Sequence, residues 1–130
     1  MPNKTMLDQV TEMHDHFGLY TTLHPTPLTA EEKDFRLKCL REEVQEFEDA
    51  HTLADQLDAL VDLTVFTLGT ADRLGMANVF EIAFARVMKA NMQKEVARTA
   101  EDSKRGFKTD LVKPAGWTAP DLTDLVGEKP

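Results

Sequence analysis

One aspartate in an otherwise apolar segment restricts what this chain can fold into more than any other feature. Asp62 lies within Ala59–Phe66, where almost every neighbour favours burial. An ionised carboxylate without a partner in such a place costs several kcal/mol, or it takes up a proton. A basic side chain, a proton or a metal ion would each relieve that cost. Arg36, Arg41 and Arg73 are candidate partners, but their spacing places none of them beside Asp62.

Apolar residues recur at helical spacing along most of the chain, and no strand-like alternation is visible. The segment Leu57–Leu68 is apolar nearly all round, which predicts a central, buried helix. The preceding helix should pack through a stripe formed by Leu37, Leu40, Val44 and Phe47. The sequence therefore predicts an all-α four-helix bundle. The expected helices cover residues 3–17, 29–50, 52–74 and 78–96.

The last quarter of the chain differs in composition from the helical part. It mixes charged residues with glycines and prolines and shows no core of its own. We expect a helical domain over residues 1–97 and a C-terminal tail over residues 98–130, which packs on the bundle or on a neighbouring subunit. A chain of 130 residues is short for a self-sufficient core, so a homo-oligomer is expected.

Charge and composition exclude several classes of protein. The net charge of −8 argues against nucleic-acid binding, although a divalent cation would still let an acidic protein handle phosphates. Neither a membrane-spanning apolar run nor a secretory signal pattern is visible. Cys39, the one cysteine, excludes an intramolecular disulfide, and we expect it to serve as inert packing. These features predict a cytoplasmic protein.

Acidic residues gather on the second and third expected helices. At 100° per residue, Glu43 borders the apolar stripe of its helix, and Glu46 is its neighbour at i+3, with Cβ atoms about 5–6 Å apart. On the next helix, Asp55, Asp58 and Asp62 fall within about 60° of one another. Acid-rich helices are often only solvated faces. The position of Asp62 instead favours a metal site.

We expect that site to hold Mg²⁺, which prefers oxygen ligands and binds substrate phosphates at the same time. Its predicted ligands are Glu43, Glu46, Asp58 and Asp62. Glu42 and Asp55 are further candidates, as ligands or as residues just outside the ligand shell.

These residues carry a family resemblance. Glu42-Glu43-Val44-Gln45-Glu46, followed by an Asp-rich buried helix, resembles the EExxE…ExxD signature of the MazG-like all-α nucleoside triphosphate pyrophosphohydrolases. The second half departs from that signature, because Asp55 stands where Glu is usual. The pair Asp58 and Asp62, followed by Gly69-Thr70-Ala71, is similar to the short, phage-type branch.

Three further elements extend the resemblance over most of the chain. His14-Asp15-His16-Phe17 is similar to the N-terminal His-x-x-Phe element of that branch. Asn91-Met92-Gln93-Lys94 is similar to its Asn-Met-x-Lys motif, and residues 113–122 are similar to its C-terminal ending. The resemblance implies nucleotide contacts by Asn91, Lys94, Lys113, His14 and Trp117. Packing is the alternative reading for His14 and Trp117.

The resemblance implies hydrolysis of a (d)NTP to (d)NMP and pyrophosphate by a homodimer or homotetramer. Two or more Mg²⁺ ions per site are implied, and Mn²⁺ is expected to substitute for them. Glu43 or Glu46 is the expected acceptor of the proton from the attacking water. MazZ-type members of the branch favour guanine nucleotides. Alternatives are phosphoribosyl-ATP or dUTP as the substrate, or a non-catalytic acidic module that binds a metal or a partner.

Overall fold

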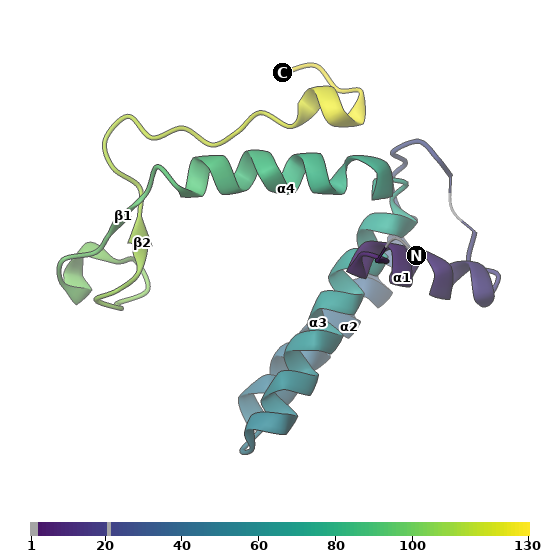
Figure 1. Ribbon diagram of the computed structural model, residues 1–130, viewed down its shortest axis with the longest axis horizontal. Helices are drawn as coiled ribbons and strands as arrows, with labels where there is room; N and C mark the ends of the chain where they lie inside the picture. Colours follow the sequence, from purple (N-terminus) through teal and green to yellow (C-terminus); the bar gives the residue numbers. More distant parts are fainter. Residues whose placement is uncertain (1–2, 21) are drawn as a thin grey trace. The chain divides into compact units, whose positions relative to one another are not determined.

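The computed structural model describes residues 3–20 and 22–130. Within them the chain forms two compact units, Met1–Asn78 and Val79–Pro130, which we describe separately. No helix among the described residues is long and apolar enough to cross a bilayer. The α-helices are α1 (Met6–His16), α2 (Ala30–Asp49), α3 (Leu53–Arg73) and α4 (Ala77–Asn91) (Figure 1). The other elements are strands β1 (Glu95–Val96) and β2 (Leu111–Val112) and 3-10 helices η1 (Ala100–Asp102) and η2 (Thr123–Val126).

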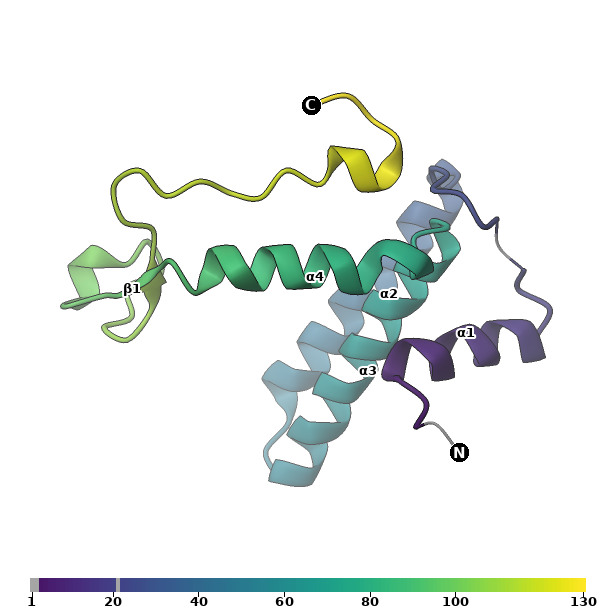
Figure 2. The same ribbon diagram turned by 45° about the horizontal axis from the view of Figure 1, so that its top comes forward.

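The first unit is built on the antiparallel pair α2 and α3, which lie side by side along their length, and α1 packs against α3 (Figures 1 and 2). Local signals set where these two long helices begin. The Thr29 hydroxyl accepts a hydrogen bond from the Glu32 amide, and the Thr52 hydroxyl accepts one from the Asp55 amide. Each threonine thereby satisfies one of the free amides of a helix's first turn. The all-α class is confirmed.

The packed face of α2 differs from the expected one. The side chains of the apolar stripe are largely exposed: Leu37 is 38 % exposed, Val44 54 % and Phe47 43 %. The buried residues of α2 are instead Arg36, Cys39 and Glu43. Within the first unit, the stripe is therefore largely uncovered. Helical periodicity identifies an apolar face but not what covers it.

The central helix α3 is also less enclosed than its sequence predicted. Leu57, Leu60 and Val61 are 64 %, 47 % and 51 % exposed, although Ala59 and Leu68 are buried. The N-terminal half of α3, which carries the acidic residues, is thus partly exposed in this unit. Burial increases toward the C-terminal half, where Gly69, Ala71 and Asp72 are buried.

In the second unit, the last helix is shorter than expected, and the segment after it forms strands that were not expected. α4 ends at Asn91, not near Val96, and a short sheet follows it. Its strands are antiparallel, with Glu95 opposite Val112 and Val96 opposite Leu111. Two-residue strands are too short to show the alternation that identifies a strand in sequence. The boundary between residues 97 and 98 stays a prediction.

The C-terminal segment runs back along α4 (Figure 1). The Trp117 indole N–H donates to the carbonyl of Ala90 over 2.7 Å. Farther along, Arg86 donates both Nη1 and Nη2 to the carboxylate of Asp124. Side-chain hydrogen bonds to α4 therefore hold a segment that has few apolar residues.

Candidate metal centre

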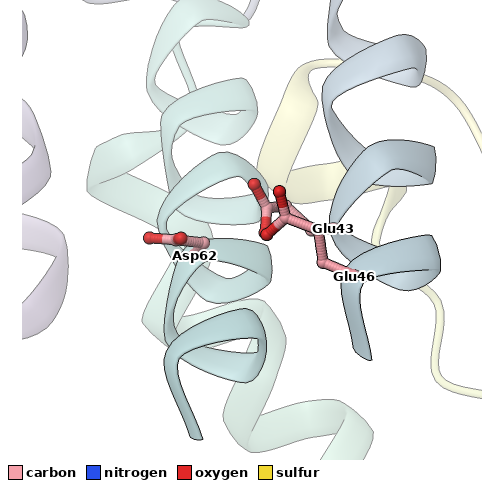
Figure 3. A group of neighbouring side chains, drawn as sticks. All are labelled: Glu43, Glu46 and Asp62. Carbon is pink, nitrogen blue, oxygen red and sulfur yellow. The ribbon is translucent and has the colours of Figure 1, made fainter. Parts of the chain in front are cut away.

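Three carboxylates converge between α2 and α3. One oxygen each from Glu43, Glu46 and Asp62 lies within 4.8 Å of the other two. Figure 3 shows Glu43 and Glu46 extending from α2 toward the helix that carries Asp62. Glu43 is buried, Asp62 is half-buried and Glu46 is exposed, so the group runs from the helix interface out to solvent. Three acceptors that close together form a cage for a cation.

Helix geometry explains how these side chains meet. Glu43 and Glu46 are three residues apart on α2, so they occupy one face of that helix. Because the buried face of α2 carries Glu43, that face directs both glutamates at α3. Asp62 lies on the facing side of α3, in the segment where its apolar neighbours are only partly covered. The predicted convergence of acids from two adjacent helices is found here.

The electrostatics of this group are unfavourable in the absence of a cation. Burial, together with a hydrogen bond to Glu46 and the charges of Glu46, Asp62 and Asp58, raises the pKa of Glu43 to about 7. The Glu43 Oε2 atom is buried and has no hydrogen-bond partner in the described structure. A buried acceptor without a donor is costly, and a positive ion at that point would remove the cost.

The donor chemistry fits a hard dication. All three groups are carboxylates, the ligand type that Mg²⁺, Ca²⁺ and Mn²⁺ prefer. Among the residues described, none forms an ion pair with Asp62, and Arg73 pairs instead with Glu32 through Nε at 2.8 Å. The arginines therefore leave the carboxylates uncompensated. Glu43, Glu46 and Asp62 are the residues that would hold such an ion.

The other predicted acids lie outside this close group. Asp58 is exposed. Its negative charge contributes to raising the pKa of Glu43. Glu42 and Asp55 are exposed as well, and the amide of Asp55 is used in the first turn of α3. Ligand roles for these three residues stay predictions.

Two predicted nucleotide-binding lysines meet at one aromatic ring in the second unit. The ammonium groups of Lys94 and Lys113 lie 5.3 Å and 5.0 Å from the centre of the Trp117 ring. Both are attracted to its π face, which brings two positive charges to one ring. Asn91, at the end of α4, donates weakly to the Met88 sulfur. We call Lys94, Lys113 and Trp117 the basic cluster.

His14 has a packed position. Its ring is 3 % exposed, and its Nδ1 lies 2.6 Å from Asp72 Oδ2. This hydrogen bond joins α1 to α3 across 58 residues of sequence. The structure thus places His14 in the core of the first unit, in line with the packing alternative, and its nucleotide contact stays a prediction.

Sequence reasoning missed two buried polar residues of this unit. Arg36 is 7 % exposed and Asp72 is also 7 % exposed, and neither belongs to a motif. The available signal was Gly69. A Cβ at Gly69 would lie 3.0 Å from Arg36 Nη1 and 3.4 Å from the His14 ring, so a larger residue there would push these two side chains back by a few tenths of an ångström.

The comparisons with known proteins agree with this geometry. A search of curated proteins finds no match. The family model of phosphoribosyl-ATP pyrophosphohydrolase matches residues 10–91, which is more than half of the chain and includes all three carboxylates. That family lies within the MazG-like all-α NTP pyrophosphohydrolase superfamily, and its members are typically metal-dependent. The chain belongs to the phosphoribosyl-ATP pyrophosphohydrolase family and, through it, to the hydrolases that act on phosphoric anhydride bonds of nucleotides.

Proposed function

We propose that the protein hydrolyses a (d)NTP, with dGTP or GTP as the preferred substrate, to (d)NMP and pyrophosphate in the presence of Mg²⁺. The observation that carries this proposal is the convergence of Glu43, Glu46 and Asp62 within 4.8 Å of one another. No described cation compensates that convergence, and Glu43 has a buried oxygen without a partner. A dication that also binds phosphates would compensate the negative charge of this group.

The metal ligands in this proposal are Glu43, Glu46 and Asp62, with Asp58 completing the shell. Two or more Mg²⁺ ions are expected per site, with Mn²⁺ as a substitute. When bound, they would neutralise phosphate charge and lower the pKa of an attacking water. Glu43 or Glu46 accepts the proton of that water. The water oxygen bonds to the α-phosphorus, and the bond from this phosphorus to the bridging oxygen breaks.

The departing pyrophosphate needs positive charge, and the basic cluster offers it. Lys94 and Lys113 each carry an ammonium group held near the Trp117 ring. We assign them, together with Asn91, to contacts with the phosphates of the substrate. Charge placed where the leaving group develops its own charge lowers the barrier to cleavage.

We also propose that the protein works as a homodimer or homotetramer. The support is the exposed apolar surface of the first unit. Val44 on α2 and Val61 on α3 are 54 % and 51 % exposed, and Phe35 is 54 % exposed. Apolar side chains gathered on packed helices mark surfaces that another protein element covers.

A product assay tests the proposal. Purified protein is incubated with each dNTP and NTP and with Mg²⁺, and the products are separated by ion exchange. We expect monophosphate and pyrophosphate in equal amounts, and no turnover in EDTA. Glu46→Gln should abolish turnover and leave the helical circular dichroism unchanged, whereas Glu48→Gln, a matched exposed glutamate on α2, should retain it. Turnover by Glu46→Gln would remove Glu46 from the site.

The family match supports a second candidate substrate, phosphoribosyl-ATP. Adding it and dUTP to the same panel decides among the substrates. Cleavage of phosphoribosyl-ATP alone would replace the (d)NTP proposal, while the metal centre would keep its role. Metal binding without turnover of any compound would identify a non-catalytic acidic module.

A further inference from the structure

A groove with apolar walls runs between α1 and α3 in the first unit. It leaves a cavity of about 380 Å³, and its walls include Met6, Val10 and Met13 from α1 and Val61, Val65 and Leu68 from α3. None of the residues that line it is charged. Met6 and Val61 are 68 % and 51 % exposed, and no apolar side chain larger than Leu68 is buried among the described residues of this unit. The groove therefore needs a cover that the unit itself does not supply.

The second unit carries an apolar stripe that the rest of the described unit leaves open. Phe80, Phe84, Val87 and Met88 recur on α4 at i, i+4, i+7 and i+8, which puts them on one face of the helix. Phe84 is 59 % exposed and Met88 41 %, and none of the described residues of α4 is buried. Arg86, which binds the C-terminal segment, lies about 160° around the helix from Phe84, so that segment does not cover the stripe.

The stripe and the groove match in length and in chemistry. From Leu60 to Leu68 the groove follows α3 over about 12 Å, and from Phe80 to Met88 the stripe follows α4 over about the same length. Side chains at the spacing of the stripe are the ones that a helix places in an apolar groove. Since one chain carries both surfaces, two copies can each pack α4 into the groove of the other, as the two-fold symmetry of a dimer requires.

Charge sets the direction in which a docked α4 would lie. The N-terminal half of α3 carries Asp55, Asp58 and Asp62 and no lysine or arginine. Beyond the C-terminal end of α4 lie the two lysines of the basic cluster. An antiparallel arrangement of α4 and α3 brings these lysines to the aspartates, whereas a parallel one takes them toward Arg73 at the other end of α3. Opposite charges therefore favour antiparallel docking.

The groove adjoins the metal centre. Val61 lines the groove, and Asp62, the next residue, belongs to the group of three carboxylates. With the stripe and the groove in antiparallel register, Ala90 reaches the level of Asp58, one helical turn from Asp62. The Trp117 indole is bonded to the Ala90 carbonyl, so the basic cluster lies at that end of α4. Docking in this register thus brings the cluster close to the carboxylates.

On this basis, and resting on the proposed function, we propose that the active site is shared between two copies of this chain. The α4 helix of one copy docks in the groove of the other, antiparallel to α3, and adds its basic cluster to the carboxylates of that copy. Each site then takes its metal ligands from one copy, and from the other copy the lysines that contact the phosphates.

Complementation between two inactive variants tests this sharing. Glu46→Gln removes a metal ligand and Lys94→Ala/Lys113→Ala removes the cations, so each variant alone should lose most of its turnover. The two are co-expressed with different tags and purified through both, which gives dimers with one copy of each. We expect about one-half of the wild-type kcat, because one of the two sites combines intact carboxylates with intact lysines.

Three results of that experiment would overturn the shared site. The first is failure of the two tags to purify together, and the second is turnover no higher than that of the parent variants, which would mean that each chain uses its own lysines. The third is wild-type turnover by the lysine variant alone.

The oligomeric state tests the docked surfaces without relying on activity. By light scattering, the wild type should have at least twice the 14.6 kDa mass of one chain. Phe84→Glu in the stripe and Met6→Glu in the groove should each lower the mass to that of one chain, with unchanged circular dichroism. Ile82→Glu is the matched control, because Ile82 is 49 % exposed and lies about 160° around α4 from Phe84, and it should keep the wild-type mass.

A wild type with the mass of one chain, or a stable oligomer in Met6→Glu, would overturn the docking. Met6→Glu decides where Phe84→Glu does not fold, because Met6 is 68 % exposed in the single chain. A wild-type dimer that cleaves no nucleotide would instead refute the proposed function and leave the docked surfaces in place.

Discussion

The raised pKa of Glu43 makes proton release a quantitative signature of metal binding. With a pKa of about 7, Glu43 is protonated in about half of the metal-free molecules at pH 7. The protonated share is about nine-tenths at pH 6 and about one-tenth at pH 8. A metal ion binds the ionised carboxylate, so each binding event releases that share of a proton from Glu43. A glutamate at the ordinary value of 4.5 would release almost none at pH 7.

Isothermal titration of Mn²⁺ in two buffers with different ionisation heats measures this release. From Glu43 alone we expect about 0.5 proton per site at pH 7, rising as the pH falls, and an affinity that weakens up to about tenfold per pH unit below pH 7. Glu43→Gln should abolish the release and weaken binding, whereas Glu48→Gln should change neither. A release that is independent of pH, or that persists in Glu43→Gln, would refute this reasoning.

The remaining predictions concern stability. Since the pKa of Glu43 is raised on folding, the metal-free protein should lose stability as pH rises from about 4.5 through 7, a loss that thermal melts of Glu43→Gln should not show. Asp72→Asn should cost about 2–3 kcal/mol in urea unfolding, because buried His14 loses a charged partner; a cost near zero would contradict the pairing. Gly75→Ala should destabilise strongly in urea unfolding, because φ is +72° and the new Cβ would meet the His24 carbonyl; an unchanged urea midpoint would contradict this. Trp117→Ala should release the C-terminal segment from α4, which limited proteolysis would detect as faster cleavage; an unchanged rate would contradict its anchoring role.

The parts of the fold that local chemistry determines could be predicted from the sequence. The threonines that cap α2 and α3 act within their own first turns, and both helix starts were expected. The acidic triad was also predictable, because an aspartate in an apolar run demands compensation and the glutamates are fixed by helical spacing. The convergence of these three carboxylates therefore followed from local rules of burial and helical spacing.

The parts that depend on tertiary packing could not be predicted. The apolar stripe of α2 was visible, but periodicity does not tell whether a stripe is covered within its own unit, and Val44 is 54 % exposed. The hydrogen bond between His14 and Asp72 joins residues 58 positions apart. Burial of Arg36 likewise depends on the approach of α3 at Gly69; the glycine is visible in the sequence, but the side chain that it faces is not.

The central claim is that Glu43, Glu46 and Asp62 together hold the metal ion that nucleotide cleavage requires. Crystals grown with Mn²⁺ and an α,β-imido nucleotide, measured at the manganese absorption edge, test it most directly. We predict an anomalous peak between α2 and α3, coordinated by oxygens of these three carboxylates and by the nucleotide phosphates. Manganese bound elsewhere on the chain, with Asp62 paired to an arginine, would contradict the account.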